Sequence, residues 1–154
     1  MAGTRTTAPA QLSALELATW TGLLRAHSTL TRRLDRELEA ECGLSLAQYD
    51  VLVTIAHAPN RHLRMTELAD AVVLSRSGLT RLVDRLESLD LVARQSCPTD
   101  ARVTHATLTK EGLTALRNAT PVHLRGVRQH VTGRLSAAEQ RSVADAMARL
   151  LRDD

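Results

Sequence analysis

One stretch of the sequence, residues 75–89, gathers hydrogen-bond donors on a single face of a predicted helix. Its apolar residues recur at helical spacing and predict one buried stripe, made of Leu79, Leu82, Val83, Leu86 and Leu89. The donors lie on the opposite face and are Arg76, Ser77, Thr80 and Arg81. Arginine can fork onto a guanine edge or a phosphate, and the hydroxyls can reach base edges or backbone oxygens. Ser75 caps the helix, and Gly78 leaves its first turn open to close approach. This face therefore favours contact with a nucleic acid.

The elements around this helix predict a winged helix-turn-helix over residues 44–109. A short helix at 66–72 and a tight break come just before it, which is helix-turn-helix spacing. Two extended runs follow at once, Leu91–Ser96 and Val103–Leu108, and the loop between them contains Pro and Asp. A hairpin in this place is typical of a wing. Charge alone does not decide the function, because residues 61–105 carry seven Arg against six Asp plus Glu, and the arginines can equally serve to solvate an exposed face.

Capping boxes mark three further helix starts. In each, a serine hydroxyl and a side chain three residues later satisfy backbone N–H groups at a helix N-terminus, and the serines are Ser13, Ser45 and Ser136. The first box opens a helix over about residues 13–41, which Gly43 ends. Another helix, over about residues 110–131, is expected to be bent or interrupted at Pro121.

These elements divide the chain into four parts. Residues 1–12 are expected to form a flexible N-terminal arm, 13–43 a dimerisation helix, 44–109 the winged module and 110–154 the C-terminal dimerisation helices. Long amphipathic helices at the ends of a chain favour packing against a second subunit. The predicted fold class is therefore mainly α with a small β-hairpin wing, in which a winged helix-turn-helix is flanked by N- and C-terminal dimerisation helices.

The composition supports a folded helical protein and excludes several other classes. Hydrophobic residues make up 44% of the chain, Phe is absent, and Leu, Val and Ala must fill the core, which favours helices. The absence of a long apolar run or a signal-peptide core predicts a cytoplasmic protein with no membrane segment. No Gly-rich phosphate loop and no Gly-x-Ser-x-Gly elbow occur, so we expect no enzyme. The histidines and cysteines form no His-x3-His or Cys-x2-Cys ligand pair, so we expect no metal or other cofactor.

Three stretches together resemble the MarR family of bacterial winged helix-turn-helix transcriptional regulators. They read GLSLAQYDVL at 43–52, MTELAD at 65–70 and LSRSGLTRLVDRLE at 74–87. The wing is similar too, with Asp100-Ala-Arg102 ahead of LTKEG at 108–112. The resemblance implies a homodimeric repressor on a palindromic operator of double-stranded DNA. It also implies that Arg102 enters the minor groove, whose negative potential attracts arginine, while Asp100 braces the guanidinium.

The resemblance further implies a small, often aromatic or phenolic effector, bound between the dimerisation helices and the winged module. Trp20, His27 and Tyr49 are the candidates, because Trp20 offers a stacking face and His27 can pair with an anion. The competing explanation for each of the three is that it packs in the core or in a subunit interface and binds no ligand. Two alternatives stay open. Cys97 or Cys42 could make the regulator redox-responsive, or the chain could be a helical protein-interaction scaffold, against which the arginines of the donor face argue.

Overall fold

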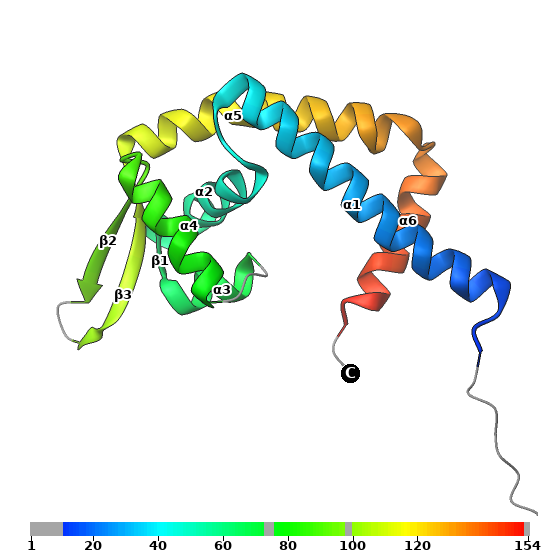
Figure 1. The fold of residues 1–154 in the computed structure, drawn as a ribbon, viewed down its shortest axis with the longest axis horizontal. Coiled ribbons are helices and arrows are strands. Elements are labelled where there is room, and N and C mark those ends of the chain that lie inside the picture. The colour runs from blue at the N-terminus through cyan, green and yellow to red at the C-terminus, as the bar shows by residue number, and fades with distance from the viewer. Residues whose placement is uncertain (1–10, 73–75, 98–99, 153–154) are drawn as a thin grey trace, which may run out of the picture.

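Two long helices, α1 (Ala14–Cys42) and α5 (Lys110–His130), pack against each other and frame the molecule (Figure 1). The computed structural model describes residues 11–72, 76–97 and 100–152, and for residues 76, 100 and 101 it describes the backbone. The winged module hangs from one end of this frame and α6 (Ala137–Leu150) from the other, so the chain has the outline of an arch. Within the described ranges, no helix is long and apolar enough to cross a membrane.

The helix boundaries follow local signals in the sequence, and all three predicted capping boxes form. At Ser45, for example, the Gln48 N–H donates to Ser45 Oγ at 3.2 Å, and the Ser45 N–H donates to Gln48 Oε1 at 2.8 Å. Gly43 ends α1 with a φ of 66°, in the left-handed region. An L-residue with a Cβ would pay about 1–2 kcal/mol for that conformation, which is why glycine ends this helix.

Gly126 of α5 faces two side chains of α1 at short distance. A Cβ at this position would lie 2.6 Å from Glu37 Oε2 and 2.6 Å from Leu34 Cδ2, so a larger residue would force these two side chains of α1 to move. Polar contacts flank the contact point. His130 Nε2 lies 2.6 Å from Glu37 Oε1, and Arg125 forms an ion pair with Glu41. The frame is thus fixed by close packing together with charged side chains.

The helix α5 continues through Pro121, so of the two outcomes expected there, a bend or an interruption, the interruption does not occur. Proline removes one N–H from the helical ladder and crowds the preceding turn. Neighbouring residues on both sides, Ala119 and Val122, are buried in the core. Their burial holds the backbone helical across the proline, which is a tertiary effect that the local pattern does not contain.

The winged module begins with α2 (Leu46–His57) and contains a three-stranded antiparallel sheet of order β1-β3-β2. Strand β3 pairs Ala106 with Leu63 of β1 on one side and with Arg94 of β2 on the other. The first strand was not predicted, because three residues are too few to show an alternating pattern. The remaining elements of the module are β1 (His62–Arg64), α3 (Met65–Ala71), α4 (Arg76–Ser88), β2 (Val92–Cys97) and β3 (Asp100–Leu108).

A single core joins the module to the frame. It contains aliphatic side chains from every helix except α6 and from the sheet, including Leu38, Leu52, Leu68, Val83, Val92 and Leu116. At about 25 cal/mol for each Å² of apolar surface removed from water, side chains of this size each contribute roughly 1.5–3 kcal/mol. The wing is connected to the long helices in two ways. Its strands contribute side chains to this core, and α5 starts directly after β3 in the chain.

Candidate nucleic-acid interface

The helix α4 presents a polar face to solvent, as its sequence predicts. Leu79, Val83 and Leu86 are at most 1% exposed and anchor the helix in the core. On the other side, Ser77, Thr80 and Arg81 are exposed, and Gly78 is half-buried. Leu89, which the apolar pattern placed in the buried stripe, lies beyond the end of α4 and is exposed, so this part of the prediction is wrong.

Two predicted residues at the start of α4 fall outside what can be placed. Ser75 lies outside the described residues, and of Arg76 only the backbone is described, as the first residue of α4. Their roles as helix cap and donor stay predictions. The exposed donors farther along the helix do not depend on them.

The wing carries Arg102 on β3, where the side chain is exposed. Asp100 opens the same strand and pairs with Cys97 of β2, next to a register shift between Ser96 and Cys97. The side chain of Asp100 is outside what the structure describes, so its bracing of Arg102 stays a prediction. In Figure 1 the strands β2 and β3 extend below the frame, to the same side of the arch as α3.

Arg94 joins the wing to α4, and sequence reasoning did not single it out. Its Nη1 lies 2.6 Å from Asp84 Oδ1 and 2.6 Å from Glu87 Oε2, and its Nη2 donates to the Thr80 carbonyl at 3.1 Å. The backbone N–H of Arg94 donates to Glu87 Oε1 at 3.0 Å. The sequence contains one signal for the position of Arg94. Side chains alternate between the two faces of a strand, so Arg94 points to the same side of β2 as the buried Val92, toward the helix α4.

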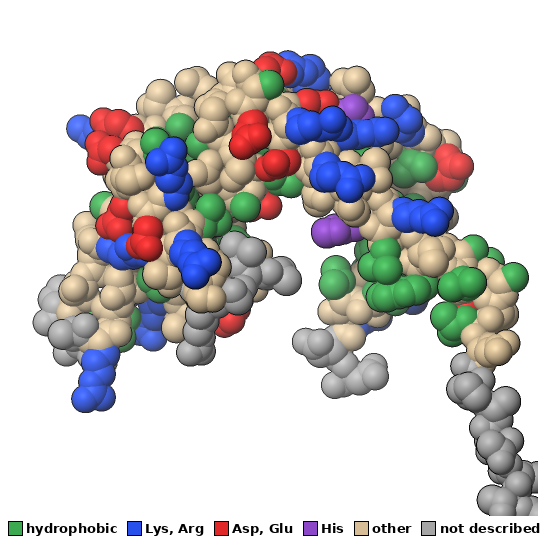
Figure 2. Space-filling view, in the orientation of Figure 1, with side chains coloured by type: hydrophobic (Ala, Val, Ile, Leu, Met, Phe, Trp, Pro, Cys, Tyr) green, Lys and Arg blue, Asp and Glu red, His purple; other side chains and the backbone are tan. Residues whose placement is uncertain are grey.

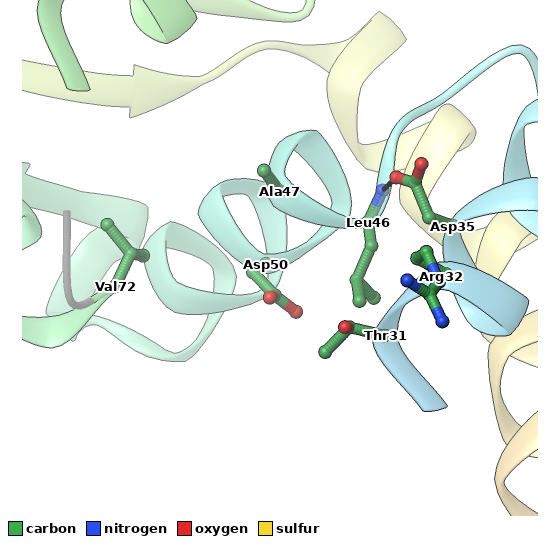
Figure 3. A pocket seen from close by; sticks show the side chains of 7 residues that line it. All are labelled: Thr31, Arg32, Asp35, Leu46, Ala47, Asp50 and Val72. Atoms are coloured by element: carbon green, nitrogen blue, oxygen red, sulfur yellow. Dashed lines mark hydrogen bonds between the residues drawn. The ribbon is translucent and has the colours of Figure 1, made fainter. Parts of the chain in front are cut away.

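A hollow lies between the frame and the winged module. It is a pocket of about 320 Å³ between α1 and α2, with α3 ending nearby (Figure 3). Asp35 Oδ1 accepts the Leu46 N–H at 2.8 Å and so ties α1 to the first turn of α2. The lining residues are Thr31, Arg32, Asp35, Leu46, Ala47, Asp50 and Val72.

A pair of titratable groups lies where α2 meets α5. Asp50 is exposed at the pocket, yet the protein around its carboxyl excludes enough water to raise the pKa, an effect that His123 partly offsets. Burial lowers the pKa of His123, and the charge of Asp50 opposes this change. The His123 ring lies against Tyr49, with ring centroids 4.6 Å apart. These groups connect the rim of the pocket to the inner face of α5.

The three candidate ligand residues do not meet in this single chain. Trp20 is 53% exposed on α1, and His27 is exposed two turns farther along. Tyr49 is 5% exposed and packs in the core against His123. None of the three lines the pocket between α1 and α2. Their role in ligand binding stays a prediction.

The cysteines lie on different elements. The Cys42 thiol is 4.0 Å from the Asn118 carbonyl oxygen, at the end of α1, and Cys97 ends β2; both are half-buried and neither forms a disulfide. The redox alternative stays untested by this arrangement. In the described part of the chain, no group of three or more His, Cys, Asp or Glu side chains could hold a metal ion.

Comparison with known proteins places this chain in a family. The MarR family model matches residues 43–103. The regulator MhqR of Bacillus subtilis is 30% identical over 101 residues, which span 66% of this chain and 68% of MhqR. The transcriptional repressor MprA of Escherichia coli K12 is 29% identical over 98 residues, 64% of this chain and 55% of MprA. Sco3205, a MarR family regulator from Streptomyces coelicolor, has been crystallised in complex with DNA, and its sequence is 39% identical to this chain. The two structures superpose with a TM-score of 0.87 over 92% of this chain and 89% of Sco3205. The chain therefore belongs to the MarR family and is a DNA-binding transcriptional regulator rather than an enzyme.

Proposed function

We propose that this regulator is a homodimeric repressor, which binds a palindromic operator and leaves it when a small ligand binds. The observation that carries the proposal is the face formed by α4 and the wing. Ser77, Thr80 and Arg81 are exposed opposite a buried apolar stripe, and Arg102 is exposed on the adjacent wing. A helix of this kind fits a major groove, and an arginine on a wing fits the narrower minor groove beside it. Ser75, Arg76, Gly78 and Asp100 belong to the same proposed interface on sequence grounds.

The second copy would cover apolar surface that a single chain leaves in water. Figure 2 shows a hydrophobic patch on the arm of the arch away from the wing, over α1 and α6. A contiguous exposed patch of large aliphatic and aromatic residues is typical of an interface. Because this surface lies on the terminal helices, the proposed partner is another copy that contributes the same helices. The exposed residues are Leu15, Leu17, Trp20, Leu23, Leu24, Val143 and Leu150.

The name of one relative and the complex of another support this reading. MprA is named as a transcriptional repressor, and Sco3205 was crystallised with DNA. Two-fold symmetry in the dimer would require a palindrome with half-sites about one helical turn, or about 10 bp, apart. We also propose a cytoplasmic location, where the chromosome is accessible.

For the ligand, we propose the pocket between α1 and α2. Arg32 supplies a cation for a carboxylate or phenolate, and the Asp50 carboxylate can accept a ligand hydroxyl. The pocket lies where the frame meets the winged module, so a ligand there can change the angle between them. Trp20 and His27 lie on the stretch of α1 that the proposed dimer covers, and they can reach a ligand only through the assembly.

Binding to DNA from upstream of the protein's own gene tests the proposal. We expect fluorescence anisotropy to show tight binding to one palindromic segment, weaker binding to a scrambled duplex, and affinity that falls steeply with salt. Light scattering is expected to give twice the 16.8 kDa chain mass. Phenolic carboxylates added to the complex should release the DNA if they are effectors. If the anisotropy shows no binding to any such DNA at low salt, the repressor proposal is refuted. If light scattering gives the mass of a single chain, the proposed dimer is refuted.

A further inference from the structure

A cleft of about 400 Å³ separates the wing from the helix-turn-helix. It is bounded by the start of α3, by α4 and by the strands β2 and β3, and we name it the wing cleft. Among the described residues its lining contains no carboxylate. Apart from Met65 and Val103, the lining consists of arginines and threonines, namely Arg64, Arg94, Arg102, Thr66, Thr80 and Thr104.

The charges of these arginines are not equivalent. Arg94 is held by two carboxylates, those of Asp84 and Glu87, which offset its charge and fix it against α4. For Arg64, by contrast, no carboxylate in the described part of the chain lies within ion-pair distance of the guanidinium, and the side chain is exposed. Its backbone N–H donates to Glu67 Oε2 at 3.1 Å, which fixes where the side chain begins. Arg64 therefore offers the cleft a positioned cation.

We propose that the wing cleft binds a phosphate of the DNA backbone, and that Arg64 and Thr66 position the duplex through it. This inference rests on the proposed function, in which α4 enters a major groove and Arg102 the adjacent minor groove. One sugar–phosphate backbone separates two such grooves, so elements that enter both must straddle it. The wing cleft is the hollow between those elements, and the backbone must pass over it.

The chemistry of the lining suits a phosphodiester. A guanidinium fork can make two parallel hydrogen bonds to phosphate oxygens, and exposed threonine hydroxyls such as that of Thr66 can donate to the same group. A base edge is a poorer fit, because the cleft lies between the two groove-entering elements rather than at their tips. A contact of this kind fixes register and orientation without carrying sequence information. Arg64 is thus assigned a different role from Arg81, which faces the bases.

The test compares Arg64→Gln with the control Arg117→Gln, which removes an exposed arginine of α5 far from the cleft. Affinities are measured by anisotropy over a salt series, for the operator and for a scrambled duplex of equal length. We expect Arg64→Gln to weaken binding to both duplexes by a similar factor, about tenfold, and to reduce the slope of log K against log salt by about one for each subunit. Thr66→Val should weaken both to a smaller extent, and Arg117→Gln should leave both unchanged.

A methylphosphonate scan of the operator locates the phosphate. Neutralising the phosphate in the wing cleft should weaken binding of the unmodified protein but add little to the loss in Arg64→Gln. Circular dichroism confirms that the variants are folded, and Arg64→Lys supplies a second variant that keeps the charge. The proposal is overturned if Arg64→Gln behaves as Arg117→Gln does, if it weakens the operator complex alone, or if no phosphate couples to it. Failure of the unmodified protein to bind any duplex would instead overturn the proposed function.

Discussion

Replacing Arg94 with alanine tests whether the wing and α4 act as one body. The substitution removes the contacts of Nη1 with Asp84 and Glu87, and the hydrogen bond from Nη2 to the Thr80 carbonyl. The Asp84 side chain is 56% exposed, so that contact is worth at most about 1 kcal/mol. The Glu87 contact is more sheltered, and we assign it roughly 1 kcal/mol, with a further ~1 kcal/mol for the Thr80 hydrogen bond. We expect a loss of about 2–3 kcal/mol in the free energy of unfolding.

Urea denaturation measures this loss, with the m-value unchanged if the variant stays two-state. The control is Arg117→Ala, an exposed position for which we expect a change within about 0.5 kcal/mol. A double-mutant cycle with Asp84→Asn and Glu87→Gln apportions the energy between the two carboxylates. DNA affinity should also fall, because the wing is no longer held at a fixed distance from α4. A loss no larger than that of the control would refute the reasoning that Arg94 joins the two elements.

Three further predictions concern other parts of the chain. Arg102→Ala is expected to weaken operator binding by about 1–3 kcal/mol in anisotropy titrations, and an unchanged affinity would contradict the role of the wing. Gly112→Ala should destabilise the fold by about 3 kcal/mol in urea melts, since the new Cβ would lie 2.0 Å from the Leu91 carbonyl oxygen; a stable variant would argue against this close approach. Burial lowers the pKa of His123 from its ordinary 6.5, so the folded state binds fewer protons than the unfolded state below that pH. Stability should therefore fall as the pH drops through about 6.5, where the unfolded state gains its proton first, and a slope that persists in His123→Gln would exclude His123 as its source.

Much of the fold was predictable because its signals are local. A capping box needs four residues, and those at Ser13, Ser45 and Ser136 all form. The pattern could not predict β1, which is held by its pairing with β3 over three residues. It also could not predict that Pro121 stays helical, because the burial of neighbouring side chains decides this. In both cases the deciding contacts come from residues far away in the sequence.

The candidate site divides in the same way. The exposed donors of α4 follow from helical periodicity, which fixes the face of each residue once the buried stripe is known. Alternation along β2 places Arg94 on the same face as Val92, but neither the partners of Arg94 nor the role of Arg64 follows from spacing. Their roles depend on the approach of β2 to α4 and on the cleft between the wing and α3, both products of tertiary packing. The pocket between α1 and α2 likewise exists only once the chain is folded.

The stability of these contacts suggests where regulation must act. Inside the winged module, α4 and the wing share buried side chains such as Val83 and Val92 and are joined by Arg94, so changing their relative position would cost several kcal/mol. The module also shares core side chains with the frame, among them Leu38 of α1 and Leu116 of α5, but beside this shared core lies an open pocket bridged by the hydrogen bond from Leu46 to Asp35. A ligand in this pocket has fewer contacts to disrupt than one between α4 and the wing. If it binds one position of the module more tightly than another, it shifts the equilibrium between these positions by the difference in affinity. We therefore expect an effector to move each winged module as a rigid unit relative to the long helices, and so to change the spacing of the two α4 helices in the proposed dimer while leaving the α4–wing contacts intact.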